Sequence, residues 1–245
     1  MKSGTRITGN ITRKKYHFSP EPQTKEVKYD GVMESKKLVI IGAGGHGKVA
    51  ADCAEQQGGF SSIIFLDQGG SEHKDYPWPI LDKPENFARF IDGNSSFFVA
   101  IGHNASRDRW TQALIAGNAP LATLIHPTAV ISAHSQIGAG TLVCARAVVN
   151  PFTSIGISCI VNTSAIIEHD CKVNDLVHVA PGSCLAGNVE VGRASFIGIG
   201  TSIVPGIKLG ANVQIGAGAA VTKDIKDNCL AVGVPARIIK SLPSC

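Results

Sequence analysis

The feature that most constrains this chain is a six-residue repeat of aliphatic side chains. The repeat begins at Ile125 and continues to Val221 without an exception. A period of six is typical of a parallel β-helix, in which one aliphatic side chain per hexapeptide enters the interior and stacks on its equivalent in the next coil. Three hexapeptides make one triangular coil, so seventeen of them predict between five and six coils. The positions are Ile125, Ile131, Ile137, Val143, Val149, Ile155, Val161, Ile167, Val173, Val179, Leu185, Val191, Ile197, Ile203, Leu209, Ile215 and Val221.

Two further regularities accompany the repeat. The residue after the aliphatic is glycine in six units, and the residue four positions after it is mostly small. Small side chains suit the crowded interior of a narrow prism. The period excludes a heptad coiled coil, and the glycines exclude an amphipathic helix. The glycines are Gly138, Gly156, Gly192, Gly198, Gly210 and Gly216, and the small residues include Ala129, Ser135, Thr141, Ala147, Thr153, Cys159 and Ala165.

Residues 36–122, before the repeat, have the pattern of a small Rossmann-like βαβ domain. Three short apolar runs suit buried parallel strands, and two other segments suit helices. Pro77, Pro79 and Pro84 predict a loop between the second and third strands. The expected strands are residues 37–41, 63–67 and 97–102, and the expected helices are residues 48–57 and 107–117.

The two ends of the chain lack both patterns. Residues 1–35 are polar and show no hydrophobic period, so we expect a disordered basic extension or tag. Residues 1–37 hold nine Lys or Arg and four acids, and the whole chain has a net charge of +4, which leaves about −1 for the remainder. The folded part therefore lacks the basic stripe of a nucleic-acid-binding domain. The β-helix is expected over residues 123–226 and a C-terminal cap over residues 227–245, with 233–236 extended and 237–241 a short helix or strand.

The cysteines and the hydropathy pattern indicate the compartment. The seven cysteines form no CxxC pair and lie mostly among apolar neighbours, which favours reduced thiols in a reducing compartment. No apolar run has the length of a transmembrane span, and the N-terminus lacks the apolar segment of a signal peptide. We therefore expect a cytoplasmic protein with neither a membrane nor a nucleic-acid partner.

The most polar part of the repeat is Glu168-His169-Asp170. A histidine titrates near neutral pH and suits a general base. A neighbouring carboxylate would hold its tautomer and favour the imidazolium form, but the sequence does not select between Glu168 and Asp170. A solvated polar corner of one coil is the alternative interpretation.

His178 lies nine residues from His169, which is half of an eighteen-residue coil. The two imidazoles therefore occupy different faces of one prism and can meet only between neighbouring chains. This geometry predicts a symmetric trimer with active sites at its subunit interfaces. We expect His126 and His134, near the start of the repeat, to be surface residues.

A glycine loop follows the first expected strand. Gly42-x-Gly44-x-x-Gly47, with Asp67 twenty residues later, satisfies the dinucleotide fingerprint. NAD binding would need a second mononucleotide-binding half, for which residues 68–124 are too few. A glycine turn that serves only packing is a further alternative.

Together the hexapeptide repeat, the opening Ile41–Val49 segment, the closing Gly233–Ala236 segment and Asn162–Cys171 carry a resemblance. Over residues 37 to about 240, the chain resembles the bacterial sugar O/N-acetyltransferase family of the NeuD and PglD type. The resemblance implies an N-terminal nucleotide-sugar-binding domain and a left-handed β-helix. It is greatest to the UDP-4-amino-sugar N-acetyltransferases.

The same resemblance implies roles for single residues. His169 matches the catalytic base, and Asp170 replaces a glutamate that raises the proton affinity of that base. Asn162 matches a side chain near the reacting sugar, and the Gly187 amide faces the thioester carbonyl. The expected acetyl-CoA contacts are His178, Gly187, Ile199 and Ala217. The expected nucleotide-sugar contacts are Gly44, Gly45, His46 and Asp67, together with Gly102 and Asn104 of the following turn.

The expected activity is transfer of acetyl from acetyl-CoA to the 4-amino group of a UDP- or dTDP-linked amino-deoxy sugar, for glycan or lipopolysaccharide synthesis, without a metal. Thiolate is a good leaving group, so a base, an oxyanion donor and positioning suffice. O-acetylation of sialic acid or another sugar hydroxyl is the close alternative. A β-helical zinc hydratase would need three converging histidines, and a non-enzymatic trimeric scaffold would need no polar corner.

Overall fold

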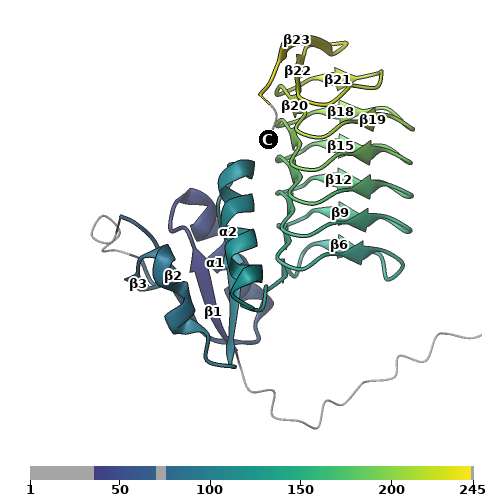
Figure 1. Ribbon diagram of the computed structural model, residues 1–245. Coiled ribbons are helices and arrows are strands. Elements are labelled where there is room, and N and C mark those ends of the chain that lie inside the picture. The colour runs from purple at the N-terminus through teal and green to yellow at the C-terminus, as the bar shows by residue number, and fades with distance from the viewer. Residues whose placement is uncertain (1–35, 70–75, 244–245) are drawn as a thin grey trace, which may run out of the picture. The chain divides into compact units, whose positions relative to one another are not determined.

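A computed structural model describes residues 36–69 and 76–243, so the expected extension over residues 1–35 lies outside the described residues. The N-terminal part is a four-stranded parallel sheet in the order β3-β2-β1-β4, with helices on both faces (Figure 1). Its elements are β1 (Lys36–Ile41), α1 (Gly45–Gln57), β2 (Phe60–Leu66), β3 (Ile80–Asp82), the 3₁₀ helix η1 (Pro84–Phe90), β4 (Ser95–Val99) and α2 (Asn104–Ala116).

Successive side chains of β1 point to opposite faces of the sheet, and each face has its own apolar core. Leu38 and Ile40 pack with α1 on one face, and Val39 and Ile41 pack with α2 and η1 on the other. A strand covered on both faces must be apolar where it is covered, and the four buried residues Leu38–Ile41 of β1 are all aliphatic. The expected strands and helices are confirmed, but the expected loop was wrong in part, because β3 and η1 lie within it. β3 is an edge strand, where flanking prolines are tolerated.

The repeat folds as predicted into a three-sided left-handed β-helix of two-residue strands, each ending on one of the seventeen aliphatics. The strands are β5 (Leu124–Ile125), β6 (Val130–Ile131), β7 (Gln136–Ile137), β8 (Leu142–Val143), β9 (Val148–Val149), β10 (Ser154–Ile155), β11 (Ile160–Val161), β12 (Ile166–Ile167), β13 (Lys172–Val173), β14 (His178–Val179), β15 (Cys184–Leu185), β16 (Glu190–Val191), β17 (Phe196–Ile197), β18 (Ser202–Ile203), β19 (Lys208–Leu209), β20 (Gln214–Ile215) and β21 (Ala220–Val221).

The strands form three parallel sheets, one per side of the prism. Sheet 1 runs from β5 through β8, β11, β14, β17 and β20 to β22 and β23; sheet 2 runs from β6 to β21; and sheet 3 runs from β7 to β19. We call the turns from sheet 1 to sheet 2 the first corner, those from sheet 2 to sheet 3 the second corner, and those back to sheet 1 the third corner.

The glycines of the repeat occur at two kinds of position, one at the corners and one directly after the aliphatic residue. From Gly140 to Gly218, every sixth residue has a positive φ of 50° to 75°, which bends the chain sharply into the next side. The glycines that follow the aliphatic have a different role. A Cβ on Gly138 would lie 2.5 Å from the backbone carbonyl group of Gly156 in the next coil, so the coils could not stack with a side chain there.

After Val221 the repeat ends in β22 (Cys229–Val232) and β23 (Arg237–Ser241). β22 pairs in parallel with β20 and antiparallel with β23, so the strand alternative for the terminal segment is confirmed. The expected extended conformation of Gly233–Ala236 was wrong: these residues form the turn that reverses the chain between the two strands.

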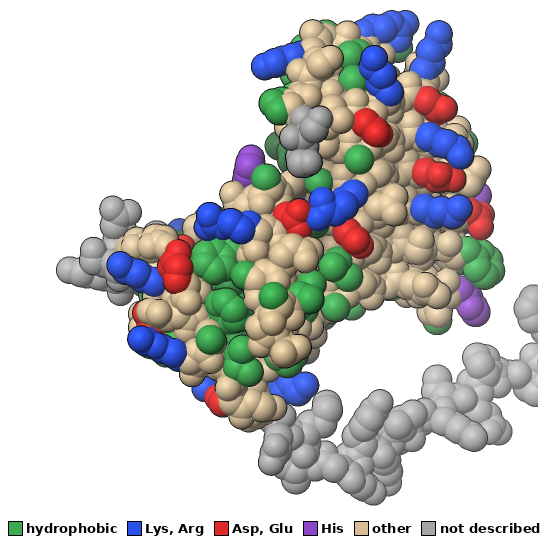
Figure 2. Space-filling model, in the orientation of Figure 1, with side chains coloured by type: hydrophobic (Ala, Val, Ile, Leu, Met, Phe, Trp, Pro, Cys, Tyr) green, Lys and Arg blue, Asp and Glu red, His purple; other side chains and the backbone are tan. Residues whose placement is uncertain are grey.

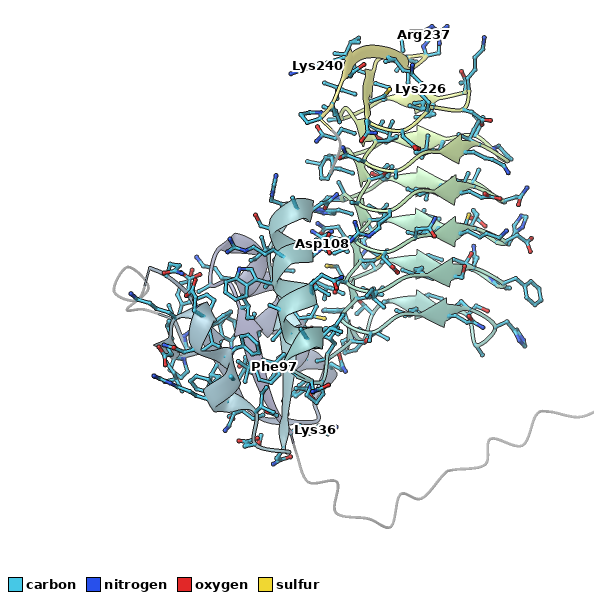
Figure 3. All side chains as sticks on the ribbon, in the orientation of Figure 1. Lys36, Phe97, Asp108, Lys226, Arg237 and Lys240 are labelled. Atoms are coloured by element: carbon cyan, nitrogen blue, oxygen red, sulfur yellow. The ribbon has the colours of Figure 1, made fainter. Side chains whose placement is uncertain are left out.

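The N-terminal domain packs on the outside of sheet 1. Leu124, Leu142 and Cys144 share one apolar core with α1. On α2, the labelled residue Asp108 pairs with Arg193 of the β-helix at 2.6 Å (Figure 3). Among the residues the structure describes, no helix is long and apolar enough to cross a membrane.

Candidate active site

His169 lies in the second corner, directly after β12. Its Nδ1 is 2.8 Å from Oδ2 of Asp170, and its side chain is 61% exposed. The Glu168 carboxylate instead accepts a hydrogen bond from Asn150 Nδ2 at 2.7 Å. The structure therefore pairs the histidine with Asp170. A carboxylate can only accept, so Nδ1 carries the proton and Nε2 is left as the basic atom.

Gly187 lies beside this imidazole in the next coil. A Cβ on Gly187 would lie 2.6 Å from Cε1 and 2.7 Å from Nε2 of His169. The absence of a side chain at Gly187 is therefore what allows the ring to lie in its place.

We expect Gly187→Ala to lower the rate of acetyl transfer with little loss of stability. Gly187 has no positive φ that alanine would strain, and its new methyl group meets only an exposed ring that can rotate away. If His169 is the base, as the resemblance implies, its displacement should cost about 10²-fold, the low end of the range for general base catalysis. Steady-state kinetics and thermal unfolding check this. At Gly182 a Cβ would meet open space, but φ is +66°. Gly182→Ala should therefore lower the thermal stability and leave the rate of acetyl transfer unchanged.

His178 projects from β14 toward the N-terminal domain. Asn162 donates its Nδ2 to His178 Nε2 at 3.2 Å, while its Oδ1 accepts from Thr163 N at 2.8 Å. The His178 ring lies 6.4 Å from the His46 ring and 5.1 Å from the Phe196 ring. The structure thus brings together three predicted site residues, Asn162, His178 and His46. His169 belongs to a different sheet and corner of the same chain, as predicted.

Burial keeps both clustered histidines neutral. Desolvation, reinforced by the Arg107 charge, lowers the pKa of His46 to about 4. The same causes, together with His46, lower the pKa of His178 to about 3. Both imidazoles therefore have hydrogen-bonding but no charged roles near neutral pH.

These pKa values predict a pH-dependent stability. Between pH 6.5 and 5 the unfolded chain binds protons on both histidines and the folded chain does not, so the free energy of unfolding decreases as the pH decreases. The loss is on the order of a few kcal/mol. Urea unfolding at pH 7, 6 and 5 measures it. The double variant His46→Asn, His178→Asn should show a flatter dependence, and an unchanged slope would contradict the assignment.

A pocket of about 400 Å³ opens at the carboxyl ends of β1, β2 and β4. Ala43 N donates to Asp67 Oδ2 and Gly69 N donates to Asp67 Oδ1, both at 2.8 Å, so this carboxylate holds the glycine loop in shape. The carboxyl end of a parallel sheet, next to a helix N-terminus, is the usual place for a nucleotide. Predicted residues in the lining are Gly44, Gly45, His46, Asp67 and Gly102, and Arg109 and Trp110 line it in addition.

Asn104 is not in this pocket. Its Nδ2 donates to the carbonyls of Ala194 at 2.6 Å and Ser195 at 3.2 Å, so it joins α2 to the third corner. It lines a separate cavity of about 600 Å³ with Gly102 and Phe196. Ile199 and Ala217 lie exposed in successive turns of the first corner, where the Ile199 carbonyl accepts from Gly218 N.

Arg107 is a residue that the sequence pattern did not single out. Its side chain is only 1% exposed and donates five hydrogen bonds, to the carbonyls of Ile101, Gly102, Ser158 and Leu176 and to Asn104 Oδ1. It ties the wall of the pocket at the carboxyl ends of β1, β2 and β4 to the third corner. Burial lowers its pKa to about 10, so it stays charged near neutral pH. An arginine within a polar helix segment carries no signal of such burial.

The surface assignment of His126 was wrong. It is buried beside α1, and its Nδ1 accepts from Thr128 N at 3.1 Å. His134 is exposed, as expected. Within residues 36–69 and 76–243, no group of three or more His, Cys, Asp or Glu is arranged to hold a metal ion.

Residues 37–114 match the PglD N-terminal domain model. A UDP-N-acetylbacillosamine N-acetyltransferase from Bacillus subtilis (strain 168) is 36% identical over 114 residues, 44% of this chain and about half (51%) of that relative.

Solved structures of other chains match over nearly their whole length, and two examples follow. The acetyltransferase domain of PglB from Neisseria gonorrhoeae FA1090, in complex with acetyl coenzyme A, has a TM-score of 0.80 and 35% identity; the match covers 84% of this chain and 100% of that one. PerB from Caulobacter crescentus, in complex with CoA and GDP-perosamine, has a TM-score of 0.78 and 34% identity, with 83% and 97% covered. With the same two-part fold and more than a third of its residues identical over these lengths, the chain belongs to the sugar N-acetyltransferase family.

Proposed function

We propose that this protein transfers the acetyl group of acetyl-CoA to the 4-amino group of a nucleotide-linked amino-deoxy sugar, with His169 as general base. The single observation that carries the proposal is the exposed His169, held by Asp170 through Nδ1 and lying over Gly187. The acetyl-CoA complex of the Neisseria relative and the GDP-perosamine complex of the Caulobacter relative support the two substrates.

The chemistry needs few groups. His169 Nε2 takes a proton from the sugar amine, and the amine nitrogen attacks the thioester carbonyl carbon. The Gly187 amide stabilises the oxyanion that forms, a contribution of about 3 kcal/mol for such a donor. The C–S bond then breaks, the C–N bond remains, and the His169 imidazolium gives its proton to the CoA thiolate, which regenerates the neutral base. Asp170 favours the imidazolium that exists between these steps.

We propose that three copies assemble around sheet 2. The outward positions of sheet 2 are occupied by Val130, Val148, Ile166, Cys184, Ser202 and Ala220, of which four are large or polarisable apolar side chains. Sheet 3 carries Lys172, Glu190 and Lys208, which form ion pairs, and charged side chains alternate along one edge of the β-helix in Figure 2. Sheet 1 is covered in part by the N-terminal domain. Sheet 2 is thus the apolar side without a cover.

A three-fold axis along sheet 2 completes the active site. It places the second corner of one copy, with His169, against the first corner of the next, with Asn162, Ile199 and Ala217. The acetyl-CoA arm would lie between these corners, near His178, and the nucleotide would lie in the pocket at Gly44–His46 and Asp67. The free thiols of the described cysteines fit a cytoplasmic reaction.

A substrate panel tests the function. The purified protein is incubated with acetyl-CoA and UDP-, dTDP- or GDP-linked 4-amino sugars, and free thiol release and product mass are followed. We expect one amino sugar to be acetylated at nitrogen, with the UDP and dTDP forms as first choices. Activity only on sialic acid or another hydroxyl sugar would replace this proposal by O-acetylation.

A further inference from the structure

Phe152 is held in an unfavourable backbone conformation with most of its side chain in solvent. It lies in the second corner after β9, with a φ of 61°, and is 70% exposed. The corner imposes this left-handed φ on every equivalent position from Gly140 to Gly218, and most of these positions hold glycine, asparagine or another small residue, so a bulky apolar side chain is unusual there. Leu176 is the other large apolar residue at a left-handed corner position, and it is only 1% exposed. Other residues of the chain therefore bury Leu176, whereas nothing in the described part of the single chain buries the Phe152 side chain.

His134 and Phe152 together form an aromatic corner. Their rings stack with centroids 5.9 Å apart at 27°, and Phe152 N donates to the His134 carbonyl at 3.1 Å. The next coil at the same corner carries His169 and Asp170, where Asp170 N donates to the Pro151 carbonyl. The aromatic corner is therefore one coil away from the catalytic base.

An open apolar pocket exists at the same height on another part of the chain. It has a volume of about 500 Å³ and lies between α1 and the first corner, and we call it the α1 pocket. Its lining consists of Lys48, Val49, Asp52, Cys53, Trp78, His126, Cys144, Ala145 and Thr163. Thr163 follows Asn162, so this pocket borders the expected site of the reacting sugar.

Symmetry relates the aromatic corner to the α1 pocket. A rotation about an axis parallel to the β-helix keeps every residue at its own height. Ala145 and Phe152 belong to one coil, so the second corner of one copy meets the first corner of the next beside the α1 pocket. The side chains that contribute most to protein–protein binding are often aromatic rings that fill an apolar pocket of the partner. Phe152 and the α1 pocket have these two properties.

We propose that Phe152 of one copy inserts into the α1 pocket of a second copy of this chain. The inference rests on the trimer of the proposed function. Its consequence is that one side chain fixes the N-terminal domain of one copy to the β-helix of the next, next to the point where His169 and Asn162 meet. Assembly and catalysis are then coupled by this contact.

Phe152→Ala and Val49→Arg test the two sides of the contact. Phe152 is exposed and Val49 is 43% exposed in the single chain, so both variants should fold. We expect sedimentation to show a trimer dissociation constant raised at least about 30-fold. Activity should fall at low protein concentration and recover at high concentration. Leu81→Ala removes an apolar side chain on β3 whose exposed fraction, 56%, lies between those of Val49 and Phe152, and it should change neither assembly nor activity.

A cysteine pair gives an independent measurement. In a Cys53→Ala, Cys144→Ala background, which removes the native thiols of the α1 pocket, Phe152→Cys with Val49→Cys should give covalently linked copies on a non-reducing gel. Phe152→Cys alone in that background should not. Unchanged assembly of the variants together with the absence of a cross-link overturns the inference. A raised KM for the nucleotide sugar in Phe152→Ala without a change in assembly also overturns it, because Phe152 then contacts the substrate. A wild-type monomer overturns the inference whether or not it acetylates. A wild-type trimer that cross-links but acetylates no sugar supports the interface and rejects only the proposed function.

Discussion

Replacing His169 by alanine should lower kcat/KM for acetyl transfer by about 10²- to 10⁴-fold. This imidazole is the proposed base, which Asp170 contacts at Nδ1, and its exposed position contributes little to the fold. We therefore expect thermal stability and assembly to stay as in the wild type. Steady-state kinetics with acetyl-CoA and the amino sugar found by the panel measure the loss, and intact activity would reject His169 as the base.

The two neighbouring carboxylates provide matched variants for this prediction. Asp170→Asn removes the charge that stabilises the imidazolium and should also slow the reaction. Glu168→Gln changes a carboxylate that contacts Asn150 rather than His169, and it should leave the rate close to that of the wild type. Equal losses in both variants would show that neither carboxylate has a specific contact with the base.

Arg107→Met should lower the free energy of unfolding by about 3–5 kcal/mol, the largest stability effect we expect. The variant removes a buried guanidinium and leaves the buried carbonyls of Ser158 and Leu176 without their donor. Arg107→Lys should recover only part of the loss, because an ammonium group cannot reproduce the planar array of donors. Chemical unfolding of the variants and the wild type measures the differences.

Arg109 offers a control on the same helix. Arg109 is exposed, so Arg109→Met should stay within about 0.5 kcal/mol of the wild type. A loss of less than about 1 kcal/mol in Arg107→Met would show that water replaces the lost donor and that the guanidinium is not what joins the two parts of the chain.

Candidate site residues could be named from the sequence where they lie in a short contiguous motif. Contacts between segments far apart in the chain could not be predicted in this way. The resemblance proposed His169 as the base, and the structure shows that Asp170 contacts it while Glu168 turns to Asn150 one coil away. Asn104 was expected at the nucleotide, but its amide bonds to a corner 90 residues further along the chain. His126 was expected at the surface, but α1 covers it.

By itself the sequence determined the β-helix, because an interior of fixed period accepts one aliphatic side chain every six residues and no other packing satisfies all seventeen. Only the tertiary structure decided that Arg107 is buried, that sheet 2 is the apolar side left uncovered, and that Phe152 is exposed at its edge. The physical reason is that the repeat specifies which side chains point inward, whereas the cover on the outward ones depends on where the N-terminal domain packs.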